Sequence, residues 1–71
     1  MTTYDTERGP FAVWFVNALE ERHHIRTLES LEAAERRAER VFRVAEAEGC
    51  FGCAVHIVDA QGKLFSSQVV Q

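Results

Sequence analysis

Lysine, proline and long apolar runs are almost missing from this sequence. Lys63 is the only lysine, and with eleven acidic residues against eight basic ones the net charge is −3. An acidic chain without a basic run lacks the electrostatic footprint of a protein that binds duplex nucleic acid, so we expect no direct nucleic-acid partner. No apolar stretch approaches the length of a membrane span, so we expect no membrane partner either.

The N-terminal sequence shows no sign of a secretion signal. The stretch "MTTYDTERGP" has neither a basic n-region nor an apolar h-region. We therefore expect a cytoplasmic protein, in which the two cysteines are reduced thiols. With 71 residues, 46% of them hydrophobic, the chain has room for one core and no second one. Domains this short bury barely enough apolar area to fold, which favours self-association.

Residues 1–9 are polar and close with Gly9-Pro10, which predicts a flexible N-terminal arm before a single domain over residues 10–71. The domain begins with "FAVWFVNA", which is rich in the β-branched and aromatic residues of a strand. Both sides of this strand are apolar, which is typical of a strand covered on both faces or central in a sheet. One side carries Phe11, Val13 and Phe15, and the other carries Ala12, Trp14 and Val16.

A second strand, "RHHIRTL", is expected to return through a hairpin at "LEER". Simple alternation places His23, Ile25 and Thr27 on one side, with Ile25 marking the inner face. His24 and Arg26 then lie on the outer side. The two adjacent histidines are therefore expected on opposite faces of the sheet.

The most clearly marked element is a helix that begins after Ser30 and ends near Glu48. Ser30 is a good N-cap, Glu32 lies in the first turn, and Gly49 suits the left-handed position that follows a helix. One apolar stripe runs along this helix, and we expect it to pack on a sheet with Val41 and Phe42 as its main anchors. The stripe consists of Leu31, Ala34, Ala38, Val41, Phe42 and Ala45.

"CAVHIVD" and "KLFSSQVV" form the last two strands, joined by the turn "AQG", in which Gly62 suits a positive φ. On the first of these, Cys53, Val55 and Ile57 share one side, and Ala54, His56 and Val58 share the other. The order is ββαββ. We therefore predict an α+β protein with an antiparallel sheet of two hairpins and one helix packed on one face.

Cys50 and Cys53 form a Cys-x-x-Cys pair, which is half of many tetrahedral zinc sites. Such a site needs two more ligands, but strand alternation separates His23 from His24, and also Cys53 from His56. A redox pair is normally found at a helix N-terminus, whereas Cys50 follows a helix C-terminus. We therefore favour a structural role without metal or cofactor, in which Cys53 is a small core residue, Cys50 helps to close the helix end and Phe51 is tucked beneath it. A zinc-binding or redox module stays the alternative.

Catalysis is not favoured, because the sequence contains no Ser-His-Asp set, glycine-rich phosphate loop or paired carboxylates. A small enzyme using His24 and His56 would need a pocket that a single-layer sheet does not suggest. The arginines of the helix alternate with glutamates, which indicates a solvated, salt-bridged face rather than a phosphate site.

The doubly apolar first strand instead predicts a surface for a protein partner. If Phe11, Val13 and Phe15 face the helix, an apolar patch is left on the open side of the sheet, and such a patch usually marks an interface. A second copy would cover it as well as another protein would, so a homodimer is the alternative. The candidate partner-binding residues are Trp14, Val16 and Val58, with His24, Arg26 and His56 as a polar rim, and Phe65 is a further candidate for the apolar patch.

The run "ESLEAAERRAERVFRVAEAEGCFGCAVHIVDAQGK" resembles the helix–strand–turn core of short ββαββ proteins from phages and bacteria, some anti-CRISPR proteins among them. The resemblance rests on the capped alanine-rich helix, the Cys-Phe after its end and the glycine turn. It implies a non-catalytic, stoichiometric inhibitor that occupies a surface on a nucleic-acid-guided defence complex. The acidic balance, with one lysine, suits binding to the basic nucleic-acid groove of such a complex. No functional residue carries over from the resemblance.

Overall fold

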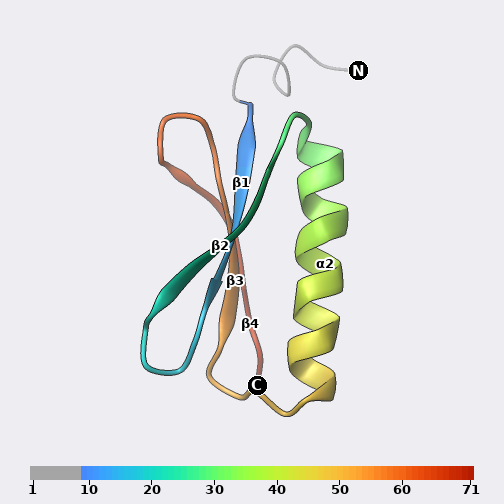
Figure 1. Ribbon diagram of the computed structural model, residues 1–71, viewed down its shortest axis with the longest axis vertical. Helices are drawn as coiled ribbons and strands as arrows, with labels where there is room; N and C mark the ends of the chain where they lie inside the picture. The colour runs from blue at the N-terminus through green and yellow to red at the C-terminus, as the bar shows by residue number, and fades with distance from the viewer. Residues whose placement is uncertain (1–8) are drawn as a thin grey trace.

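The computed structural model describes residues 9–71 and shows the predicted α+β fold. The expected N-terminal arm, apart from Gly9, lies outside the described residues. A single helix packs on one side of a four-stranded antiparallel sheet with the order β2-β1-β3-β4 (Figure 1). The two hairpins therefore join through β1 and β3 at the centre of the sheet. The elements are β1 (Phe11–Val16), β2 (Arg22–Leu28), α2 (Leu31–Ala47), β3 (Ala54–Val58) and β4 (Leu64–Val69).

Both ends of α2 are capped as the sequence predicts. The Ser30 side chain accepts a hydrogen bond from the backbone N–H of Ala33 at 3.1 Å. At the other end Gly49 has a φ of +72°. Its N–H donates to the Glu46 carbonyl at 3.1 Å, and the Cys50 N–H donates to the Ala45 carbonyl at 2.9 Å, the pair of bonds that defines a Schellman motif.

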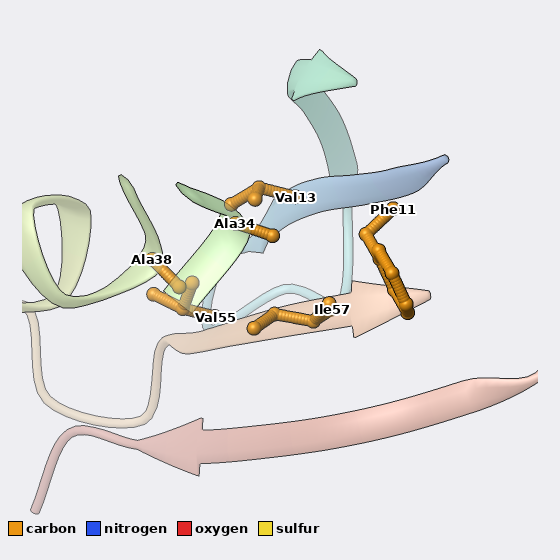
Figure 2. Packing of buried hydrophobic residues seen from close by; sticks show 6 residues of the cluster. All are labelled: Phe11, Val13, Ala34, Ala38, Val55 and Ile57. Atoms are coloured by element: carbon orange, nitrogen blue, oxygen red, sulfur yellow. The ribbon is translucent and has the colours of Figure 1, made fainter. Parts of the chain in front are cut away.

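The core lies between α2 and the two central strands. Figure 2 shows Ala34 and Ala38 of the helix beside Val13, Val55 and Ile57 of the sheet. The small alanines are the most deeply buried residues of the helix stripe, because the helix lies close on the sheet. Val41 and Phe42 pack against this core but are only partly buried, so they are not the main anchors that the stripe suggested. Within residues 9–71, no helix combines the length and hydrophobicity needed to cross a bilayer.

The two hairpin loops have the same design. In each loop an Asn or Asp side chain accepts hydrogen bonds from the backbone N–H groups two and four residues later: Asn17 from Leu19 and Glu21, and Asp59 from Gln61 and Lys63, all at 2.9–3.0 Å. The fourth loop residue has a positive φ, 65° at Glu20 and 82° at Gly62. Both loops curl away from the helix (Figure 1).

A β-bulge in β2 changes which residues share a face. Trp14 lies opposite His24 and Val13 lies opposite Arg26, so Ile25 is an extra residue in β2. Alternation therefore breaks at Ile25, and every later residue of β2 lies on the face opposite to the predicted one. Ile25 itself is 38% exposed and stays outside the core, so it is not the inner-face marker that the sequence suggested.

Candidate functional site

The sheet face opposite α2, hereafter the open face, can be assigned from the strand register, because residues paired across antiparallel strands point to the same side. Phe11 and Val13 are fully buried under the helix. Because successive side chains of a strand point to opposite faces, Trp14, which directly follows Val13, lies on the open face. His24 of β2 and His56 of β3 are its two cross-strand partners. The remaining residues of the face are Ala12, Val16, Arg22, Thr27, Ala54, Val58, Leu64, Ser67 and Val69.

Trp14 is held by polar side chains from β2. The His24 ring meets it edge-on, with ring centroids 5.0 Å apart, and the Arg22 guanidinium lies over its ring at 4.8 Å from the centroid. His24 Nε2 is 2.9 Å from the Thr27 hydroxyl oxygen, which fixes the orientation of the imidazole. The indole therefore packs against Arg22 and His24 and is half-buried on a face that the helix does not cover.

Beside Trp14 the open face is hollowed into a shallow depression of about 350 Å³. Arg22 and His56 supply its polar lining, and Val16, Val58 and Leu64 supply its apolar lining. Glu20 and Gly62, one from each hairpin loop, complete it at its two ends. The open face thus combines apolar contact area with cationic and imidazole groups, and its strands carry no acidic side chain.

The structure brings five of the six predicted partner-binding residues together on the open face, namely Trp14, Val16, His24, His56 and Val58. Arg26 does not belong with them. It lies opposite Val13 and therefore on the helix side of the sheet, because the bulge at Ile25 reverses the alternation.

Arg22 takes the place that Arg26 was expected to fill. It lies two residues before His24, so alternation along β2 was signal enough to find it. Phe65 is also on the other side, because its ring contacts Phe11 at 5.8 Å between centroids and packs against the core. Leu64 and Val69 extend the open face instead, and they are 54% and 49% exposed. Neither was among the candidate residues predicted from the sequence.

The cysteine pair lies at the end of the helix. Cys53 is buried, and Cys50 is partly buried with its backbone N–H in the helix-closing bond described above. Partial burial raises the pKa of the Cys50 thiol, and the neighbouring Cys53 and Glu48 raise this pKa further. A thiol shifted in this direction is a weaker nucleophile at neutral pH. Phe51 is 64% exposed rather than tucked beneath the helix end.

The histidines and cysteines of residues 9–71 do not converge. His23 lies opposite Phe15, on the helix side of the sheet, while His24 lies opposite Trp14 on the open face. In this part of the chain no three His, Cys, Asp or Glu side chains gather closely enough to hold a metal ion.

Comparison of the chain with protein-family models, with curated proteins and with solved structures gives no match.

Proposed function

We propose that the protein is a small, non-catalytic binding module that recognises another protein through its open face. The observation that carries this proposal is Trp14, a half-buried tryptophan on a sheet face that the helix leaves uncovered. Arg22 and His24 cover only part of this ring, and tryptophan is a common hot spot at interfaces, where a partner covers the rest of the ring.

The surroundings of Trp14 support the same proposal. Val16, Val58 and Leu64 provide apolar contact area, while Arg22, His24 and His56 provide donors at its margin. A central aromatic anchor with a polar rim is the usual anatomy of a protein interface. The depression beside the anchor is shallow, which suits a protruding side chain of a partner better than the enclosure of a substrate.

The more specific form of the proposal is a stoichiometric inhibitor of a nucleic-acid-guided defence complex. The resemblance of residues 29–63 to anti-CRISPR proteins supports this form. The net charge of −3 favours long-range approach to a basic surface, but the acidic residues lie outside the strands of the open face, so the contact itself would depend on the apolar residues around Trp14. The inhibitor would act by occupying that surface, with no reaction of its own.

The test compares Trp14→Ala with Phe51→Ala, since Phe51 is an exposed aromatic residue at the helix end, away from the open face. Wild type, Trp14→Ala and Phe51→Ala are each immobilised and used to capture partners from a bacterial lysate. The proteins that each form retains are then quantified. We expect Trp14→Ala to lose the partner that wild type and Phe51→Ala retain. Equal retention by Trp14→Ala would remove the open face from the binding surface.

Two further measurements separate the forms of the proposal. Sedimentation equilibrium of wild type and Trp14→Ala shows whether a second copy is the partner. Titration into a purified defence complex tests the inhibitor form, for which we expect complete loss of target cleavage near one inhibitor per complex. Undiminished cleavage by every complex tested, even with a large excess of the protein, would exclude those complexes as targets of inhibition. The general proposal of a protein-binding module would remain.

A further inference from the structure

The two edge strands of the sheet differ in their protection against further pairing. β2 carries Arg22, His23, His24 and Arg26, and charged side chains discourage a new strand from pairing with an edge. Each edge strand also contains one bulge, at Ile25 in β2 and at Phe65 in β4, so the bulges do not distinguish the two edges. β4, with the sequence "LFSSQV", carries no charge and no proline. In the described part of the chain no strand lies beyond β4, so its outer edge has no strand to pair with.

A groove runs along β4 on the helix side of the sheet. The helix packs over β1, β3 and part of β2, which leaves β4 exposed for most of its length. Ser66 and Gln68 of β4 form one wall of the groove, Val55 and Ile57 of β3 form its floor, and α2 forms the other wall. Its volume is about 270 Å³.

The helix wall of this groove is acidic. It consists of Glu35, Ala38 and Glu39. Glu39 pairs with Arg43 at 2.8 Å, and elsewhere on the helix Glu32 pairs with Arg36 at 3.6 Å. Within residues 9–71, Glu35 has no ion-pair partner, so one carboxylate beside the groove is available to a cation of another molecule.

We propose that β4 and this groove bind an extended peptide segment of a partner protein that contains lysine or arginine. The segment adds a fifth strand beside β4 through backbone hydrogen bonds, which is a common mode of peptide recognition. Alternate side chains of an added strand point to the helix side, where an apolar side chain contacts the groove and a basic side chain reaches Glu35. This site is separate from the open face and does not depend on the function proposed for it.

A second copy of the chain fits this site less well than a basic peptide. Two β4 strands can pair antiparallel about a two-fold axis perpendicular to the sheet, and the helices of both copies then lie on the same side of the joined sheet. The acidic helix walls would face each other across the two β4 strands, where the unpaired Glu35 side chains repel. The centre of β4 also offers Ser66, Ser67 and Gln68, so self-pairing buries little apolar area.

The direct test uses synthetic peptides of about eight residues, the length of a long strand. Valine and lysine take turns on one face of the peptide strand, at every second position, and threonine fills the other face, so that one face offers both an apolar and a basic side chain. Binding to the full chain is followed by amide NMR and by hydrogen exchange. We expect shifts in β4 and around Glu35, together with slower exchange of β4 amides. A peptide with glutamate in place of lysine, and one with a central proline that cannot donate a strand hydrogen bond, should both bind at least fivefold more weakly.

Two pairs of variants with matched charge locate the site. Glu35→Lys should weaken binding at least fivefold, whereas Glu46→Lys, which makes the same charge change on α2 outside the groove, should change it less than twofold. Gln68→Lys should weaken binding in the same way, whereas Ser67→Lys, on the open-face side of the same strand, should not. Circular dichroism confirms that each variant is folded.

Several results would overturn the inference. The lysine peptide could fail to bind, or the proline peptide could bind equally well, or the shifts could appear on β2 or around Trp14. Equal effects of Glu35→Lys and Glu46→Lys would show that only net charge attracts the peptide. A dimer in sedimentation equilibrium of the protein alone that Gln68→Lys dissociates would make a second copy the occupant of β4.

Discussion

Replacing Glu20 by glycine should stabilise the protein, because Glu20 has a backbone conformation that glycine adopts without strain. Its φ is 65°, in the left-handed region, where a residue with a Cβ atom costs about 1–2 kcal/mol. Glycine loses more backbone entropy on folding, which offsets about 0.5–1 kcal/mol of this gain. The Glu20 N–H donates to the Asn17 carbonyl at 2.9 Å, and this bond is retained in the variant. We therefore expect a net stabilisation of about 0.5–1 kcal/mol.

The second hairpin supplies the reciprocal experiment. Gly62 occupies the same loop position with a φ of 82°, and a Cβ atom added there meets no atom within 4 Å. Gly62→Ala therefore introduces backbone strain without a clash, and it should destabilise the protein by about as much as Glu20→Gly stabilises it. Thermal melts should move in opposite directions, by about 4–8 °C for each kcal/mol in a domain of this size. A Glu20→Gly variant that melts at or below the wild-type temperature, beside a destabilised Gly62→Ala, would refute the equivalence of the two loops.

Three further expectations concern the core, the second loop and the thiol. Phe11→Ala should lower the free energy of unfolding, measured in urea, by about 3–5 kcal/mol, because Phe11 is fully buried. Phe42→Ala, at a half-buried position, should lower it by less, and equal losses would mean that Phe42 is a main anchor of the helix after all. Asp59→Ala should lower it by about 1–3 kcal/mol because two backbone N–H groups lose their acceptor, whereas Asp59→Asn keeps an amide oxygen there and should lose clearly less. The raised pKa of Cys50 should make its alkylation slower than that of a free cysteine near neutral pH, with a rate that keeps rising at higher pH as the thiolate forms; faster labelling than the free thiol would restore the redox interpretation.

Much of the fold could be predicted because its signals are local. Ser30 and Gly49 bound the helix through capping chemistry that depends on a few neighbouring residues, and Gly62 marks its turn through its own backbone freedom. The alternating pattern of β1 placed Phe11 and Val13 under the helix and Trp14 on the open face, as the register confirms. The order of the strands in the sheet did not follow from the sequence, because it depends on pairing between distant segments.

The errors arose where one residue changes a periodic pattern or where exposure depends on tertiary packing. The bulge at Ile25 leaves no mark in the composition of β2, yet it moves Arg26 to the helix side. Phe65 is likewise an extra residue, because Leu64 lies opposite Val58 and Ser66 lies opposite Ile57. This second bulge lets the Phe65 ring pack on the core rather than on the open face. Phe51 is exposed in the turn that follows the helix, and its hydrophobicity alone does not reveal this. In the first hairpin loop Glu20, not glycine, holds the left-handed position, so the residue type at this position gives no signal for the turn.

Trp14 is the only tryptophan of the chain, so its fluorescence reports on the open face alone. The measurement is quenching of this fluorescence by iodide, for the protein by itself and with the partner that it captures. The fluorescence of the same complex formed with Trp14→Phe is subtracted, because the partner's own tryptophans also emit. If the open face is the binding surface, the half-buried indole is accessible to iodide in the free protein and becomes protected when the partner saturates the protein. In addition, Trp14→Ala weakens binding by about 2 kcal/mol or more, roughly thirtyfold, without loss of the fold. Quenching that stays unchanged at saturation, or a Trp14→Ala variant that binds as tightly as wild type, would contradict the proposed function.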